Sequence, residues 1–210
     1  MQKIIFLPLL LISTNIFAQR DYNFEEAHEN FFRVGAKVGV NANKITGQSY
    51  KQGFNYNYQL GAFMQFNFSS RFGLQPEVNF VQSSSEFTND ANDVYNDIFR
   101  DGSQKKAKLN YLEVPLLLNI NIGLESKRLK LQFGPAYGNL FRQTVDSLKA
   151  GGTAALYKTA DWSLIGGFFI QLPVIHLGAR YKMGLTNLNA VDDKQQWKSQ
   201  AIQIFAGITL

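Results

Sequence analysis

The sequence predicts an all-β protein, an eight-stranded antiparallel up-and-down transmembrane β-barrel with short periplasmic turns and longer extracellular loops. Three observations favour this fold. Apolar residues recur at every second position in eight segments, long and short connections alternate between the segments, and the glycines of the segments gather on one face. A period of two indicates strands. Alternating loop lengths are typical of barrels that cross an outer membrane.

The first four segments each place apolar side chains on one face and polar or small ones on the other. They read FRVGAKVGVNAN (32–43), NYNYQLGAFMQFNF (55–68), FGLQPEVNF (72–80) and LNYLEVPLLLNINIG (109–123). The fourth resembles a membrane helix, but a carboxylate, a proline and two amides interrupt it at alternate positions. A strand with one apolar face accounts for this pattern, whereas a membrane helix needs about 20 mainly apolar residues.

The last four segments follow the same rule. They read LKLQFGPAYG (129–138), DWSLIGGFFIQL (161–172), IHLGARYKMGL (175–185) and AIQIFAGITL (201–210). Two prolines, Pro115 and Pro135, fall nearly opposite each other across the turn between the fourth and fifth segments. Because proline has no N–H to donate to a strand ladder, we expect a β-bulge or kink there.

The placement of glycine indicates which face is inside. Ten of the 17 glycines lie on the polar face, and only Gly166 lies on the apolar face. The interior of an eight-stranded barrel is just wide enough for side chains to fill, so large polar residues there need small neighbours. The polar face is therefore expected in the lumen and the apolar face against lipid. The alternative is a soluble periplasmic barrel of lipocalin type, with the faces reversed.

The charged residues of the polar face form the candidate site. We expect a lumen ion network of Arg33, Lys37, Glu77, Glu113, Lys130, Arg180 and Lys182, with Arg142 also facing inward at its outer rim. Charges in a narrow lumen must be paired or hydrogen-bonded. The network is interpreted as a structural plug, and the alternative is a proton or ion path. The sequence does not rank Arg180, Lys182 and Lys37 as partners of the two glutamates.

The N-terminus predicts export. Residues 1–18 combine Lys3, nine apolar residues and a small residue at Ala18, as a signal peptide does. Residues 19–31 then form a periplasmic lead-in, and 32–210 form the barrel domain in the outer membrane. The chain has no Cys, and its formal net charge of +5 comes from scattered residues. Outer-membrane lipid is therefore the expected partner, and nucleic acid is not.

Catalytic and metal-binding patterns are missing from the sequence. The two histidines, His28 and His176, are far apart, and no HExxH motif or paired metal ligands occur. We therefore expect no catalytic residues, no metal and no cofactor.

One loop contains a candidate docking surface. The longest outer connection, 84–107, contains Val94, Tyr95, Ile98 and Phe99 at helical spacing. One interpretation is a solvated loop with a small self-packed cap. The other is a docking surface for an envelope protein, with Tyr95 and Phe99 as aromatic anchors.

The segments also carry a family resemblance. The stretches GLQPEVNF (73–80), LNYLEVPLLLNI (109–120), QFGPAYG (132–138) and GARYKMGLTNL (178–188) together resemble the PorT-like outer-membrane β-barrel family of Bacteroidota. The resemblance implies an eight-stranded barrel of OmpA or OmpX type, a group in which most members have no assigned activity. Such barrels usually end in an aromatic residue, whereas this chain ends in Leu210.

These expectations define a functional hypothesis. The chain is expected to be a monomeric, non-enzymatic outer-membrane barrel with a plugged lumen, acting as an envelope scaffold or protein-interaction component. The alternatives are a small-solute transport or ligand-binding barrel, a lipid-modifying barrel enzyme and a soluble lipocalin-like carrier.

Overall fold

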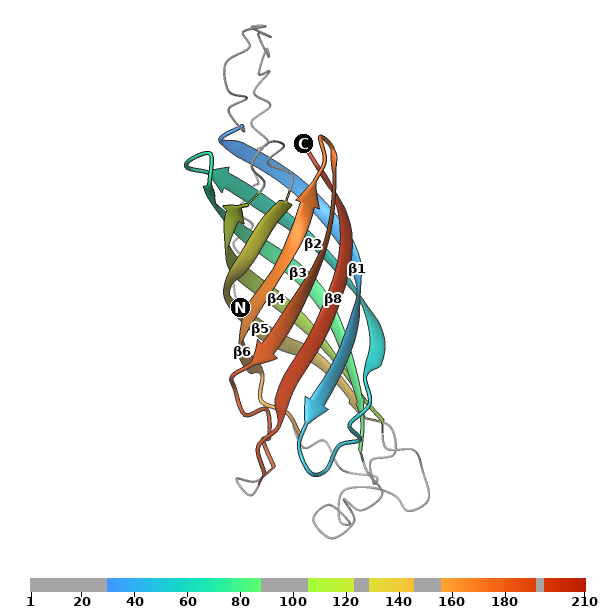
Figure 1. Ribbon diagram of the computed structural model, residues 1–210. Helices are drawn as coiled ribbons and strands as arrows, with labels where there is room; N and C mark the ends of the chain where they lie inside the picture. The colour runs from blue at the N-terminus through green and yellow to red at the C-terminus, as the bar shows by residue number, and fades with distance from the viewer. Residues whose placement is uncertain (1–29, 88–105, 123–128, 146–155, 192–194) are drawn as a thin grey trace, which may run out of the picture.

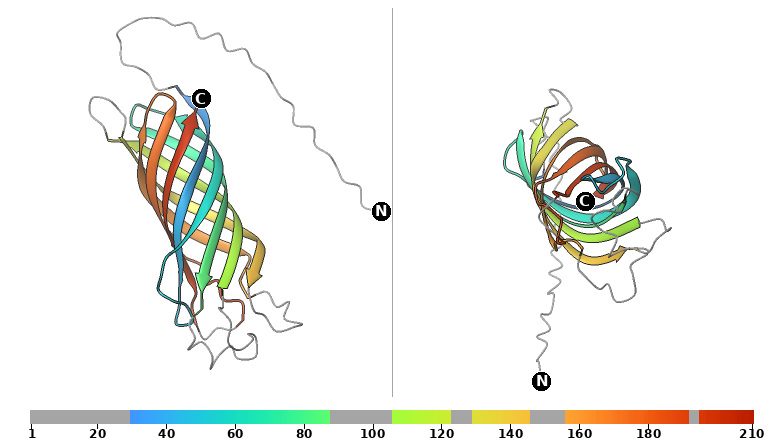
Figure 2. Two further views of the ribbon diagram at one scale, coloured as in Figure 1. Left: turned by 90° about the vertical axis from the view of Figure 1, so that its right-hand side faces the viewer. Right: turned by 90° about the horizontal axis from the view of Figure 1, so that it is seen from below.

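The structure is a closed barrel of eight strands. This computed structural model describes residues 30–87, 106–122, 129–145, 156–191 and 195–210. The strands are β1 (Phe32–Thr46), β2 (Asn55–Asn67), β3 (Phe72–Glu86), β4 (Lys106–Asn121), β5 (Leu129–Val145), β6 (Ala160–Gln171), β7 (Ile175–Gly184) and β8 (Lys198–Thr209). Each strand pairs antiparallel with the next, and β8 closes on β1 (Figures 1 and 2). The predicted fold is confirmed. Within the described residues, no helix is long and apolar enough to cross a membrane.

Both ends of the barrel wall meet at one rim. The N–H of Leu210 donates to the carbonyl of Val34 at 2.8 Å, and the N–H of Val34 donates back at 3.3 Å. The short connections 68–71 and 172–174 lie at this same end, which we call the periplasmic end (Figure 1). The opposite end, which carries the longer connections, is called the outer end.

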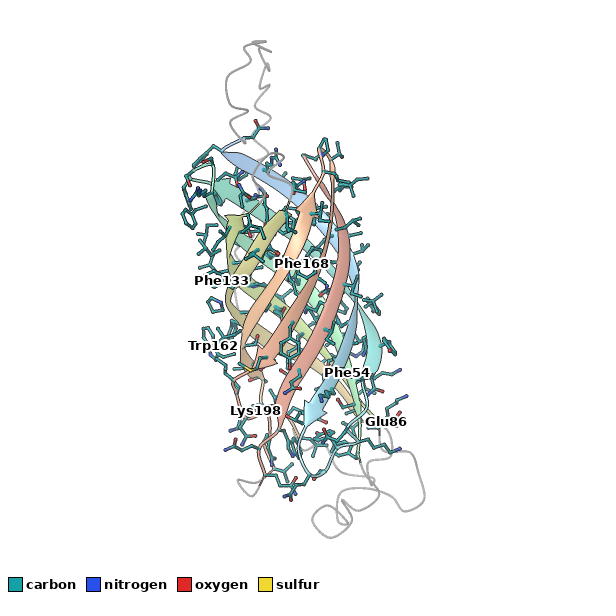
Figure 3. The ribbon with its side chains drawn as sticks, in the orientation of Figure 1. Phe54, Glu86, Phe133, Trp162, Phe168 and Lys198 are labelled. Carbon is teal, nitrogen blue, oxygen red and sulfur yellow. The ribbon has the colours of Figure 1, made fainter. Side chains whose placement is uncertain are left out.

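The apolar face of each strand points away from the lumen. In β4, Leu112, Val114 and Leu116 are 45–46% exposed, whereas the intervening Glu113 is fully buried. Side chains such as Phe133 and Phe168 project from the wall, Trp162 lies nearer the outer end, and Lys198 and Glu86 lie at the outer rim (Figure 3). This order places an apolar band around the barrel and charged residues beyond it, as a bilayer requires.

Five strands continue further toward the outer end than the apolar alternation indicated, with β1 reaching Thr46 and β8 beginning at Lys198. β3 extends to Glu86 through a stretch of glutamine and serine, β4 begins at Lys106, and β5 extends to Val145. These extensions project beyond the apolar band. Their outward side chains therefore need not be apolar, and the period of two disappears from the sequence although the ladder continues.

Of the β-bulge or kink predicted at the prolines, the β-bulge is wrong. Pro115 pairs with Ala136, and Leu118, three residues later, pairs with Phe133, three residues earlier. The β4–β5 register is therefore the same on both sides of Pro135. Proline removes a donor there, but no extra residue is inserted.

The bulge lies nearer the outer end of the same strand pair. Asn110 pairs with Arg142 and the adjacent Tyr111 pairs with Leu140, so Phe141 is the extra residue of β5. A bulge reverses the side-chain alternation beyond it. Leu140 is buried, and both Phe141 and Arg142 are exposed on the outer surface. The expectation that Arg142 faces the lumen is therefore wrong.

Candidate functional site

A buried carboxylate lies at the centre of the lumen. Glu77 of β3 accepts a hydrogen bond from Lys37 Nζ of β1 at 2.5 Å. The guanidinium of Arg180 on β7 binds both carboxylate oxygens, with Nη1 at 2.9 Å and Nη2 at 2.8 Å. All three residues are at most 3% exposed. Such a bidentate pair fixes the orientation of both partners as well as adding energy. We call these three residues the Glu77 cluster.

Glycine in the intervening strand makes the first of these contacts possible. Lys37 on β1 must pass over β2 to reach Glu77 on β3, and its partner in the β1–β2 ladder is Gly61. A Cβ at Gly61 would lie 1.9 Å from Asn79 Oδ1 and 3.2 Å from Lys37 Cε. The lumen glycines therefore provide the space that the long charged side chains occupy.

Amide side chains complete the coordination of the Glu77 cluster. Gln75 Nε2 donates to Glu77 Oε1 at 2.7 Å, and Asn79 Nδ2 donates to Oε2 at 3.0 Å. Gln132 Oε1 accepts from Arg180 Nε at 2.8 Å, and its own amide donates to Asn119 Oδ1 at 2.7 Å. Desolvated charges are tolerable when their remaining donors and acceptors are satisfied in this way.

A second group of charges lies nearer the outer end. Lys182 of β7 donates to Glu113 of β4 and contacts Asp161 Oδ2 of β6 at 3.2 Å. Ser199 Oγ donates to the same Asp161 oxygen at 3.0 Å. The group holds two carboxylates and one ammonium, whereas the Glu77 cluster holds one carboxylate and two cations. The charges of the two groups therefore nearly balance along the lumen.

Aromatic side chains close the periplasmic end. The imidazole of His176 contacts the rings of Phe63, Phe169 and Phe205, with centroids 4.9, 6.0 and 5.8 Å away. The Arg180 guanidinium lies 4.4 Å from the centroid of the Phe205 ring. The Phe205 ring therefore separates the Glu77 cluster from the periplasmic rim. The Arg180 guanidinium over the face of this ring adds a favourable cation–π contact.

A larger aromatic cluster closes the outer end. Tyr50, Phe87, Tyr157 and Trp197 are each at most 3% exposed. Tyr50 stacks on Phe87 at 4.5 Å, and its hydroxyl is hydrogen-bonded to that of Tyr157 at 2.7 Å. Single β-bridges join Tyr50 to Phe87 and Tyr157 to Asn189. We call these four aromatic residues the outer cap, because they join segments from all four outer connections.

Little space remains between these layers. A cavity of about 20 Å³ lies between the second charged group and the outer cap, lined in part by Asn41, Asp161 and Lys182. It has room for about one water molecule. Among the described residues, the hollow around His176 and Arg180 adds no further space, with a volume of about 0 Å³.

The structure brings together most of the residues proposed from the sequence, but not all. Lys37, Glu77 and Arg180 meet in one cluster, and Glu113 and Lys182 meet in the other. Lys130 is fully buried, with Nζ 5.9 Å from the centroid of the Phe169 ring. Arg33 is half-buried and forms no ion pair with any described residue.

Sequence reasoning missed other parts of the site. Asp161 and the amides of Gln75, Asn79 and Gln132 lie on the polar face of the sequence pattern, but the predicted network does not include them. The outer cap was also missed, because its residues come from irregular segments with no period of two. The candidate docking residues Val94, Tyr95, Ile98 and Phe99 lie outside the described residues, as does the predicted signal peptide.

The donor sets offer no metal site in the described part of the chain. No group of three or more His, Asp or Glu side chains is arranged there to hold a metal ion. The buried carboxylates are engaged by lysine or arginine, and the Nδ1 atom of His176 lies 3.1 Å from Thr209 Oγ1.

Comparison with known proteins identifies a family and several similar structures. The family model described as "Outer membrane protein beta-barrel domain" matches residues 17–190. Ail, the attachment invasion locus protein of Yersinia pestis, is 13% identical with a TM-score of 0.48, over 85% of this chain and 98% of that chain. Neisserial surface protein A is 13% identical with a TM-score of 0.47, over 84% and 96%. The N-terminal β-barrel domain of Pseudomonas aeruginosa OprF is 9% identical with a TM-score of 0.35, over 86% and 98%. No curated protein matches the sequence.

Proposed function

Because the chain belongs to the family of outer membrane protein β-barrel domains, we propose that it is a monomeric, non-enzymatic barrel with a plugged lumen. In this proposal it serves the cell envelope as a scaffold or protein-interaction component. Residues 1–18 act as its export signal. The proposal includes the PorT-like assignment, which is supported by the segment from Tyr111 to Leu118.

The filled lumen is the observation that carries this proposal. A transport barrel needs a path for solute, and barrels with an aqueous channel have about 16–18 strands. Here the Glu77 cluster, the second charged group and the outer cap occupy successive layers of an eight-stranded barrel. Small-solute transport is therefore the weaker alternative.

The same contacts support a non-enzymatic role. A general base or nucleophile must be able to reach a substrate. The buried Glu77 and Glu113 are instead held by cations in a closed interior. His176 is 2% exposed and enclosed by aromatic rings. None of these groups has the open approach that catalysis requires.

Recognition is therefore assigned to the outer connections. Loops on a rigid scaffold commonly carry binding residues, and the outer cap gives the bases of these connections a fixed support. The connection between β3 and β4 is the longest and carries Val94, Tyr95, Ile98 and Phe99. We propose that these four side chains dock an envelope protein.

Deleting Asn89 to Asp101 tests this role. The barrel should remain folded and heat-modifiable on gels, because neither β3 nor β4 loses a residue. In-cell crosslinking followed by purification should recover fewer protein partners than with the full chain. The double variant Tyr95→Ser with Phe99→Ser keeps the loop length and should show the same loss of partners, which separates the effect of these side chains from that of shortening the loop.

An unchanged set of crosslinked partners in both variants would contradict docking through this loop. The short periplasmic turns would then become the better candidate surface, and the plugged barrel itself would be unaffected.

A further inference from the structure

The β5 bulge places an aromatic ring and a cation side by side on the outer surface. In a regular strand Arg142 would share the inward face of Leu140, but the extra residue Phe141 turns Arg142 outward. Phe141 is 55% exposed, and Arg142 is exposed beside it. Bulges commonly redirect a side chain in this way.

Two further cations flank this position. Lys108 on β4 pairs with Thr144 and is therefore the diagonal neighbour of Arg142 across the β4–β5 ladder. On the other side, the N–H of Leu140 donates to the carbonyl of Thr159, which brings the exposed Lys158 alongside Phe141. We call Lys108, Arg142 and Lys158, together with Phe141, the bulge patch.

The charges of the bulge patch are not neutralised by described residues. Glu86 is the diagonal neighbour of Lys108 across the β3–β4 ladder, but its carboxylate lies 3.3 Å from each of Lys51 and Lys106. No acidic group of the described chain lies within ion-pair distance of Lys108, Arg142 or Lys158. Three exposed cations with no counter-charge among the described residues make this part of the rim attractive to an anion.

The position of the bulge patch along the barrel axis indicates which kind of anion it would meet. Phe141 lies 5.7 Å from the Phe80 ring, and Trp162, which is 54% exposed, lies 5.0 Å from the Tyr137 ring. Exposed aromatic side chains mark the edge of the hydrocarbon region in barrels of this type. Arg142 and Lys108 follow Phe141 toward the outer end of the β4–β5 ladder, so these cations lie just beyond that edge, at the level of the lipid headgroups.

We propose that the bulge patch binds the phosphate of a phosphorylated glycolipid in the outer leaflet. Arg142 would grip the phosphate through two guanidinium N–H groups, a geometry for which arginine is suited. Lys108 and Lys158 would contribute point charges, and Phe141 would contact the sugar and the first methylenes of the acyl chains. A soluble anion would use the cations but gain nothing from Phe141. This binding site is independent of docking through the loops.

Binding to lipid of defined headgroup tests the proposal. The full chain is placed in phosphatidylcholine nanodiscs containing a small fraction of bis-phosphorylated lipid A or its dephosphorylated form. Spin-labelled versions of each lipid should quench Trp162, since the other tryptophan, Trp197, is 1% exposed. We expect the phosphorylated lipid to quench at the lower concentration.

Variants that remove equal charge distinguish binding at the bulge patch from general electrostatic attraction to the outer rim. Lys108→Gln with Arg142→Gln should weaken binding of the phosphorylated lipid by about 10- to 30-fold, as expected for two cations near a charged surface. The control, Lys44→Gln with Lys198→Gln, removes the same charge from β1 and β8. It should change binding by less than about threefold. Arg142→Lys should weaken binding severalfold, because lysine keeps the charge but cannot make the two guanidinium contacts. All variants should keep heat-modifiable migration, because none of these residues is in the lumen.

Three results would overturn the proposal. An equal loss in the two double variants would indicate general attraction to the rim. Equal affinity for the dephosphorylated lipid would exclude phosphate recognition. If inorganic phosphate displaced the phosphorylated lipid at a concentration equal to that of the lipid, the bulge patch would be a site for soluble anions.

Discussion

Replacing Glu77 by glutamine should lower the free energy of unfolding of the barrel by about 3–5 kcal/mol, the usual cost of breaking a buried ion pair by removing one partner. The substitution preserves shape, but it leaves Lys37 and Arg180 side by side without a counter-charge. Both cations are at most 3% exposed, so water cannot solvate them. Urea-dependent folding into lipid vesicles, followed by tryptophan fluorescence, measures the difference.

Two other glutamates provide the comparison. Glu86→Gln removes an acid that is bound to Lys51 and Lys106 at the outer rim, where exposed pairs contribute about 0–1 kcal/mol. Glu113→Gln should fall between the two, because Lys182 retains Asp161 at 3.2 Å. If Glu77→Gln proved no more destabilising than Glu86→Gln, the Glu77 cluster would not be a stabilising plug.

A charge on the outward face should have the second largest effect. Leu116→Arg or Ile204→Arg places a guanidinium in hydrocarbon, at a cost of about 2–4 kcal/mol near the bilayer midplane. Both side chains point away from the lumen, with 46% and 64% exposure, and lie within the apolar band. The same vesicle-folding measurement gives the loss.

Tyr56→Arg is the matched control. Tyr56 also points outward and is 78% exposed, but it lies at the outer end of β2. There the cost should fall to about 0–1 kcal/mol. Equal costs at Leu116, Ile204 and Tyr56 would mean that the outward face does not meet a bilayer.

The fold could be predicted from the sequence because a single pattern determines it. Alternation fixes which side chains share a face, as for Leu112, Val114 and Leu116 in β4. The glycines cluster on the other face, which indicates that this face is too crowded for larger side chains at those positions, as at Gly61. Both signals are local, and neither requires knowledge of which strands meet across the lumen.

The details of the site depend on contacts that alternation does not encode. Glu77 meets Arg180 from a strand on the far side of the barrel, and this pairing depends on the register of every strand between them. The position of Arg142 depends on one inserted residue, Phe141, which carries no distinct sequence signal. Partner choice and the outward turn of Arg142 therefore became visible only in three dimensions.

The ion current through the unmutated protein in a planar lipid bilayer tests the central claim most directly. The Glu77 cluster, the second charged group and the outer cap occupy successive layers of the lumen, and the cavity between the last two has a volume of about 20 Å³. We therefore expect a current that stays at the baseline after barrels have inserted, with insertion verified by heat-modifiable migration of protein recovered from the membrane. A large, steady conductance that increases with the number of inserted barrels would contradict it.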